Sequence, residues 1–325
     1  MIKKITVIGC GRWGSLITWY LAEKKGFDVD LYGLKEAPEM QRFMAERRND
    51  LLVLPDNVRL TTELSDCMNP DVLIISIPAQ GLRGLMQDLK PYHLEDGKTA
   101  VVLCMKGLES GTGKRLSQIV KEELGETVPV AVWIGPGHVQ EFYVGVPNCM
   151  VIDSENTELK RRLVESFSSQ LIRFYYGEDM LGNEIGAASK NVIGIAAGML
   201  DGMGLSTLKG ALMSRGTREI SRLIGAMGGN ELSAYGLCHL GDYEATVFSK
   251  FSHNRAFGEA FVKGERFGAL AEGYGTVPAM IRLGKEYGTD LPICEAVYRI
   301  LYENADAATE IKSLFDRSLK KEFYV

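Results

Sequence analysis

Short runs of apolar, β-branched residues recur through the first half of the chain, and stretches with helical spacing of apolar positions separate several of them. The run at residues 72–77 is nearly all apolar, as expected for a parallel strand that is covered on both faces. This alternation predicts βαβ units in a doubly wound sheet. We expect strands at residues 5–8, 29–32, 72–77, 99–104, 130–134, 149–152 and 171–175, and helices at residues 13–25, 36–48 and 157–168.

The pattern changes near residue 178. Beyond this point the β-branched runs disappear, and helically spaced apolar positions are broken by glycine. The sequence therefore predicts an α/β fold in which a doubly wound sheet domain, residues 1–178, precedes an all-helical domain, residues 179–325. We expect a packed junction, which is a common place for a ligand cleft. Helices are predicted at residues 183–200, 208–227, 255–263, 277–287 and 293–302.

Composition and charge narrow the class of protein. Of the 325 residues, 46% are hydrophobic and 24% charged, which is typical of a globular protein. The formal net charge of −5 argues against a nucleic-acid partner but permits a local basic pocket for a phosphate. No apolar run is long enough to span a membrane, so we expect no membrane insertion.

The six cysteines are scattered, and no two of them form a C-x-x-C pair. Most lie inside apolar runs, so we expect buried free thiols rather than disulfides. Free thiols fit a reducing compartment, and the short apolar stretch at the N-terminus is interrupted by a glycine-rich turn, unlike a signal peptide. The sequence therefore favours a cytoplasmic location. The cysteines are Cys10, Cys67, Cys104, Cys149, Cys238 and Cys294.

A glycine-rich motif directly follows the first predicted strand. Gly9, Gly11 and Gly14 form a G-x-G-x-x-G pattern that also contains Arg12 and Trp13 and opens a helix. The first glycine permits the tight turn, the second lets the backbone approach a pyrophosphate, and the third lets the helix pack closely on the strand. We therefore predict a Rossmann-like site for NAD or NADP, with Trp13 packing at the edge of the cofactor.

The second predicted strand lacks the acidic residue that commonly binds the ribose 2′-hydroxyl of NAD. Counting about 20 residues on from Gly14 reaches Gly33, and Lys35 follows. A cation without an acid favours the 2′-phosphate of NADP. The alternative is that Lys35 is a solvated loop residue and that NAD binds through backbone groups.

Two lysines are candidates for chemistry. Lys190 shares one helix face with the small residues Ala187, Gly194 and Gly198, so its amine is expected to be partly desolvated and could serve as a proton donor. Lys106 follows a predicted strand at its carboxyl end, where ligands of open α/β sheets bind. The structural alternatives are a lysine that extends from a helix edge to water and an ordinary loop lysine.

The polar segment Ser252-His253-Asn254-Arg255 suits an anion, because it combines hydroxyl, amide and guanidinium donors. Ser252 could also cap the following helix, and His253 could be a neutral packing residue. Asp242 either pairs with a catalytic lysine, binds a substrate hydroxyl or caps a helix. His138 and His239 have no partners at metal-ligand spacing, so no metal site is predicted.

Several motifs occur in a definite order along nearly the whole chain, and together they resemble those of the bacterial NAD(P)-dependent glycerol-3-phosphate dehydrogenases. The most specific are Lys190-Asn191 and the downstream Gly241-Asp242. The others are Gly11-Arg12-Trp13-Gly14, Met105-Lys106-Gly107, Ile134-Gly135-Pro136, Ser214-Arg215-Gly216, Asn254-Arg255 and Ala271-Glu272-Gly273.

The resemblance implies the reduction of dihydroxyacetone phosphate to sn-glycerol 3-phosphate by NAD(P)H, a step that feeds glycerophospholipid synthesis. Lys190 would then protonate the ketone oxygen, Lys106 would orient the substrate and contact the cofactor, and Asp242 would orient the lysines. The apolar surface of the helical half suggests a homodimer. The resemblance places Gly135, Gly137, Asn191, Ser252, His253, Asn254 and Arg255 at the substrate, and Val139 and Glu272 at the cofactor.

Three motifs depart from the usual form of the family. Gly137-His138 stands where the family usually has Ser-Phe, Thr207 stands at a usual asparagine, and His253 stands at an arginine that helps to hold the substrate phosphate. These departures leave two alternatives open. One is a dehydrogenase of the same two-domain plan that acts on another hydroxy acid or polyol, and the other is a non-catalytic sensor of the dinucleotide.

Overall fold

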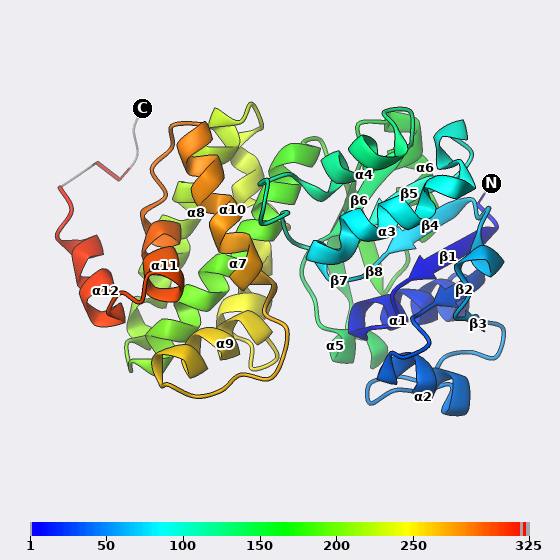
Figure 1. Ribbon diagram of the computed structural model, residues 1–325, viewed down its shortest axis with the longest axis horizontal. Coiled ribbons are helices and arrows are strands. Elements are labelled where there is room, and N and C mark those ends of the chain that lie inside the picture. The colour runs from blue at the N-terminus through cyan, green and yellow to red at the C-terminus, as the bar shows by residue number, and fades with distance from the viewer. Residues whose placement is uncertain (1, 319–320, 323–325) are drawn as a thin grey trace.

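The protein consists of two lobes that lie side by side, and its computed structural model describes residues 2–318 and 321–322 (Figure 1). The first lobe holds a sheet flanked by helices, and the second is a bundle of helices. All strands of the described chain lie in the first lobe, so the predicted fold class is confirmed. They are β1 (Lys4–Ile8), β2 (Asp28–Tyr32), β3 (Arg59–Thr61), β4 (Val72–Ile75), β5 (Ala100–Leu103), β6 (Val130–Ile134), β7 (Asn148–Asp153) and β8 (Ile172–Tyr176).

The sheet has the strand order β3-β2-β1-β4-β5-β6-β7-β8. Neighbouring strands are parallel, except that β6 and β7 are antiparallel. Because β1 pairs with β2 on one side and with β4 on the other, the strand order reverses at β1. Ligands of open α/β sheets bind at the carboxyl ends of the strands beside such a reversal. The glycine-rich motif follows β1 at this edge.

Most helices of the first lobe cover the sheet, and the sequence pattern predicted only some of them. The predicted helices correspond to α1 (Arg12–Trp19), which a π-helical turn extends to Lys24, to α2 (Pro38–Glu46) and to α6 (Thr157–Phe167). The pattern missed α3 (Leu82–Leu89), α4 (Leu116–Leu124), α5 (Val139–Tyr143) and the strand β3. β3 is only three residues long and contains a single apolar side chain, so it shows no alternation.

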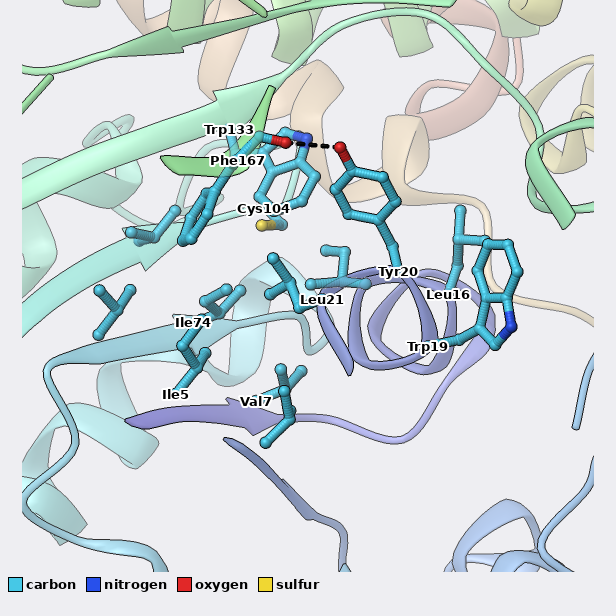
Figure 2. Packing of buried hydrophobic residues seen from close by; sticks show 14 of the residues in the cluster. Ile5, Val7, Leu16, Trp19, Tyr20, Leu21, Ile74, Cys104, Trp133 and Phe167 are labelled. Atoms are coloured by element: carbon cyan, nitrogen blue, oxygen red, sulfur yellow. Dashed lines mark hydrogen bonds between the residues drawn. The ribbon is translucent and has the colours of Figure 1, made fainter. Parts of the chain in front are cut away.

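The core of the first lobe packs α1 against the sheet (Figure 2). The ring of the buried Trp133 lies 5.6 Å from Phe167 and 4.9 Å from Phe174, measured between ring centroids. The hydroxyl of Tyr20 donates a hydrogen bond of 2.5 Å to the carbonyl oxygen of Phe167. Burial raises the pKa of Tyr20 to about 12, so the hydroxyl remains a donor at neutral pH. The hydrogen bond of Tyr20 therefore anchors the C-terminal end of α1 to the C-terminal end of α6.

The long helix α7 (Met180–Gly202) is the centre of the second lobe and is buried along nearly its whole length. A Cβ on Gly198 would lie 1.9 Å from the carbonyl oxygen of Arg255, and one on Gly258 would lie 2.1 Å from that of Ile195. These two glycines therefore permit the close packing of α7 on α9. The other helices are α8 (Lys209–Ala226), α9 (His253–Val262), α10 (Glu272–Glu286), α11 (Pro292–Tyr302) and α12 (Ala307–Phe315), of which α12 was not predicted.

Two further features are the state of the cysteines and the apolar character of the helices. The five cysteines whose side chains the structure describes are all free; Cys149 is half-buried and the other four are buried. The side chain of Cys67 lies outside the described part. Within residues 2–318 and 321–322, no helix combines the length and the apolar character that crossing a bilayer requires.

Candidate active site

The glycine-rich loop joins β1 to α1 and leaves room for a ligand. Gly9 has a φ of +111°, and a Cβ there would lie 2.1 Å from the carbonyl oxygen of Ser76. A Cβ on Gly14 would lie 1.9 Å from the carbonyl oxygen of Gly9, whereas one on Gly11 would meet nothing within 4 Å. No side-chain hydrogen bond caps α1 at Gly11, so the N–H groups of its first turn remain available to a ligand. The geometry fits a dinucleotide pyrophosphate at the helix N-terminus.

The acidic residue nearest the carboxyl end of β2 is engaged inside the sheet. Asp30, inside the strand, is buried and pairs with Arg59 at 2.8 Å and with Lys4 at 3.6 Å. Lys35 lies exposed in the turn that follows the strand. Gly33 is required by the packing, because a Cβ there would lie 2.6 Å from the sulfur of Cys10. The end of β2 thus presents an exposed ammonium group near the expected position of the ribose.

A buried carboxylate joins the two candidate lysines. The oxygen Oδ2 of Asp242 accepts from Nζ of Lys106 at 2.6 Å and lies 2.8 Å from Nζ of Lys190. Lys106 follows β5, whereas Lys190 lies on α7 and Asp242 on the short 3-10 helix Leu240–Asp242, so the cluster spans the two lobes. Nζ of Lys106 also donates to the carbonyl oxygen of Gly135 at 2.6 Å, and that of Lys190 donates to Oγ1 of Thr246 at 2.7 Å.

The environment of Lys190 changes its acidity. Burial lowers the pKa of its amine, the carboxylate of Asp242 raises it, and the nearby charge of Lys106 lowers it, so that the resulting pKa is about 8. An amine with a pKa near neutrality exchanges its proton readily at physiological pH, which a general acid requires. Thr246 was not predicted as a site residue. It lies four positions after Asp242, and the hydrogen bond from Lys190 is the only sign of its role.

Asn191 and Glu272 brace the boundary between the lobes. The amide Nδ2 of Asn191 donates to the backbone carbonyl of Lys106 at 2.9 Å. Oε1 of Glu272, the first residue of α10, accepts from the backbone N–H of Ala79 at 3.3 Å, and burial raises the pKa of this carboxyl group. Both side chains therefore reach from the helical lobe to loops at the carboxyl edge of the sheet.

The four residues of the predicted anion segment separate into different environments. Ser252 caps α9, because its Oγ accepts from the N–H of Arg255 at 3.3 Å. Oδ1 of Asn254 accepts from the N–H of Gly273 at 2.8 Å, and the side chain of His253 is exposed. The guanidinium of Arg255 faces two carboxylates, Asp201 and Glu259, each at 2.9 Å. Arg255 is thus engaged inside the helical lobe.

The loop after β6 depends on two glycines with positive φ. Gly135 has a φ of +146° and Gly137 a φ of +134°, and a Cβ on Gly137 would lie 2.3 Å from the ring of Phe142. Trp13 packs on the same Phe142, with ring centroids 6.0 Å apart, as expected of a packing residue. His138 follows the second glycine, and burial lowers its pKa. Val139 begins α5 and is buried.

Comparison with known proteins agrees with this geometry. The sequence pattern described as "NAD-dependent glycerol-3-phosphate dehydrogenase N-terminus" matches residues 4–160, and the pattern described as the C-terminus of the same enzyme matches residues 179–312. A relative named glycerol-3-phosphate dehydrogenase [NAD(P)+] from Prosthecochloris aestuarii is 35% identical, covering 98% of this chain and 99% of its own. One of the same name from Clostridium botulinum is 33% identical, covering 99% and 100%.

A solved structure shows the same arrangement of both lobes. The crystal structure of glycerol-3-phosphate dehydrogenase from Coxiella burnetii superimposes with a TM-score of 0.89 and is 29% identical in sequence. The match covers 97% of this chain and 99% of the other.

Proposed function

The chain belongs to the NAD-dependent glycerol-3-phosphate dehydrogenase family, and we propose that it is an oxidoreductase that interconverts dihydroxyacetone phosphate and sn-glycerol 3-phosphate with NAD(P)H. The observation that carries the proposal is the cluster of Lys190, Asp242 and Lys106, which lies between the lobes beside the open carboxyl edge of the sheet. A protein that only senses the dinucleotide does not require a buried amine whose pKa is near 8, so the cluster favours catalysis.

Each residue of the cluster has a separate role in ketone reduction. When bound, the reduced nicotinamide supplies a hydride to the carbonyl carbon. Lys190 donates a proton to the carbonyl oxygen, and the charge of Lys106 stabilises the negative charge that develops there. Asp242 holds both ammonium groups through one carboxylate oxygen, and Thr246 fixes the direction of Lys190. Gly135 and Asn191 fix Lys106 through its ammonium group and its backbone.

The two lobes divide the binding. We infer that residues 1–178 bind the dinucleotide, with Gly9, Gly11 and Gly14 at the pyrophosphate, and that residues 179–325 supply most of the substrate site. The open space beside Gly11 and the uncapped start of α1 support this assignment. The exposed Lys35 and the engagement of Asp30 within the sheet favour NADPH over NADH. Trp13, Lys106, Val139 and Glu272, together with the backbone of Arg12, are proposed to complete the cofactor site.

We also infer that the protein acts in the cytoplasm as a homodimer. Free cysteines support a reducing compartment. An apolar cavity of about 400 Å³ between α8, α11 and α12, together with the 64% exposed Phe315, supports a partner on the helical lobe. Light scattering after gel filtration tests the dimer, and a monomer at micromolar concentration would contradict it.

A steady-state assay tests the proposed reaction. Purified protein is mixed with dihydroxyacetone phosphate and either NADPH or NADH, and the loss of nicotinamide absorbance is followed. We expect turnover with both cofactors and a higher kcat/KM with NADPH. Turnover of a non-phosphorylated ketone, with none of dihydroxyacetone phosphate, would defeat the proposal.

A further inference from the structure

The side chain of Arg12 reaches from the glycine-rich loop to the helical lobe. Its Nη1 lies 3.3 Å from Nε2 of His253, and Nδ1 of the same imidazole lies 3.2 Å from the carbonyl oxygen of Leu270. Because a carbonyl oxygen only accepts, Nδ1 carries the ring proton and Nε2 accepts from Arg12. In this arrangement the imidazole is neutral, and the positive charge at this point of the crevice belongs to Arg12.

Three cations of the predicted site already have acidic partners. Lys106 and Lys190 share Asp242, and Arg255 is held by Asp201 and Glu259. Arg12 differs: among residues 2–318 and 321–322, no carboxylate lies within salt-bridge distance of its guanidinium. The side chain is exposed, and the contact with His253 occupies one of its five N–H donors. Arg12 therefore retains both its charge and donors for an anion.

The position of Arg12 relative to Lys190 follows from the packing of α9 on α7. Gly194 lies four residues of α7 beyond Lys190, which is about 6 Å along the helix. A Cβ on Gly194 would lie 3.3 Å from Cβ of Asn254 and 2.7 Å from Cγ2 of Thr246, whose hydroxyl accepts from Lys190. The start of α9, which carries His253, thus packs on α7 about one helical turn beyond the position of Lys190.

We propose that Arg12, a residue of the dinucleotide loop, holds the phosphate of the substrate, with the imidazole of His253 beside it. The inference rests on the proposed function, because it requires a substrate whose carbonyl lies at Lys190. In dihydroxyacetone phosphate only a methylene and an ester oxygen separate the carbonyl carbon from phosphorus, so the phosphate falls near the start of α9. A guanidinium binds phosphate through two parallel hydrogen bonds, whereas the neutral imidazole contributes no charge.

The proposal has a consequence for the two lobes. The phosphate would be bound by Arg12 from the sheet lobe and by His253 and Asn254 from the helical lobe. The anionic end of the substrate would then draw the lobes together while the carbonyl lies at Lys190, which aligns it for reaction. Selectivity for a phosphorylated ketone would therefore depend on a residue that lies outside the helical lobe.

The test replaces Arg12 with glutamine, which keeps a hydrogen-bond donor and removes the charge. We expect Arg12→Gln to lower kcat/KM for dihydroxyacetone phosphate about 10- to 100-fold, mainly through KM, since hydrogen bonds to charged groups contribute about this much. Turnover of non-phosphorylated dihydroxyacetone and the Kd of NADPH should change less than about threefold. Arg42→Gln, an exposed arginine of the same lobe that pairs with Asp50, is the matched control and should change none of these.

A second variant restores the charge from the other lobe. In Arg12→Gln combined with His253→Arg, we expect KM for dihydroxyacetone phosphate to recover at least about tenfold, because the new guanidinium lies beside the lost one. If Arg12→Gln weakens NADPH as much as the substrate, or if the double variant shows no recovery, Arg12 belongs to the cofactor and the inference is wrong. Failure of the proposed function is distinct, since the wild type would then not reduce dihydroxyacetone phosphate.

Discussion

Two substitutions should move the acidity of Lys190 in opposite directions. The charge of Lys106 lowers the pKa of Lys190 and that of Asp242 raises it, from a starting value of about 8 in the intact site. Two unit charges about 5 Å apart interact by about 3 kcal/mol at an effective dielectric constant of about 20, which corresponds to about two pH units. Lys106→Met should therefore raise the midpoint of the pH profile by about one to two pH units. Asp242→Asn should lower it by at least as much, because the carboxylate lies only 2.8 Å from Nζ of Lys190.

The assay is kcat for the reduction of dihydroxyacetone phosphate as a function of pH. Because Lys190 must be protonated to donate, wild-type kcat should be level at low pH and fall as the pH rises through about 8. Both variants will also lower the plateau, so only the midpoint is compared. Lys114→Met, at a surface lysine that pairs with Glu122, controls for a general change of charge and should leave the midpoint in place. Midpoints that shift in the same direction, or not at all, would refute the electrostatic account.

Three further predictions concern stability. Burial raises the pKa of Glu219 to about 7, so the stability that its protonated form contributes is fully present below about pH 4.5 and is lost as the pH rises through 7. The Tm of Glu219→Gln should therefore increase relative to that of wild type between about pH 5 and 8. A difference in Tm that stays constant over this range would contradict the argument. Gly137→Ala should cost about 2–4 kcal/mol in urea unfolding, because Gly137 has a φ of +134° and its Cβ would overlap Phe142; an unchanged midpoint would count against the strain. Tyr20→Phe should cost about 1–2 kcal/mol, since the carbonyl oxygen of Phe167 loses its donor, and a loss near zero would show that water replaces it.

The sheet was largely predictable because its central strands are buried on both faces. β4 and β5 are wholly apolar and fully buried, so each appears in the sequence as an uninterrupted run. Direction was not predictable: β7 runs antiparallel to β6, and the hydrophobic pattern carries no information about strand polarity. The short helix α5 has too few turns to show a clear helical period.

The site was predictable where local pattern carried the information. Lys190 stands out because a lysine among small and apolar residues must be desolvated, and the structure buries it. Partnerships between distant segments were not predictable. Arg255 pairs with Asp201, 54 positions away, and Arg12 meets His253, 241 positions away. Both contacts form because the packing of the helices brings the segments together. The charge of Arg255 is thereby paired with a carboxylate, whereas that of Arg12 remains available for an anion.

The central claim is that the amine of Lys190 supplies the proton in ketone reduction. The most direct measurement compares Lys190→Ala with wild type for kcat with dihydroxyacetone phosphate and, in parallel, for the Kd of NADPH. The account predicts that kcat falls about 10²- to 10⁴-fold, the usual contribution of a general acid, while the Kd stays within about threefold. A kcat close to that of wild type, or an equal loss in both quantities, would contradict it.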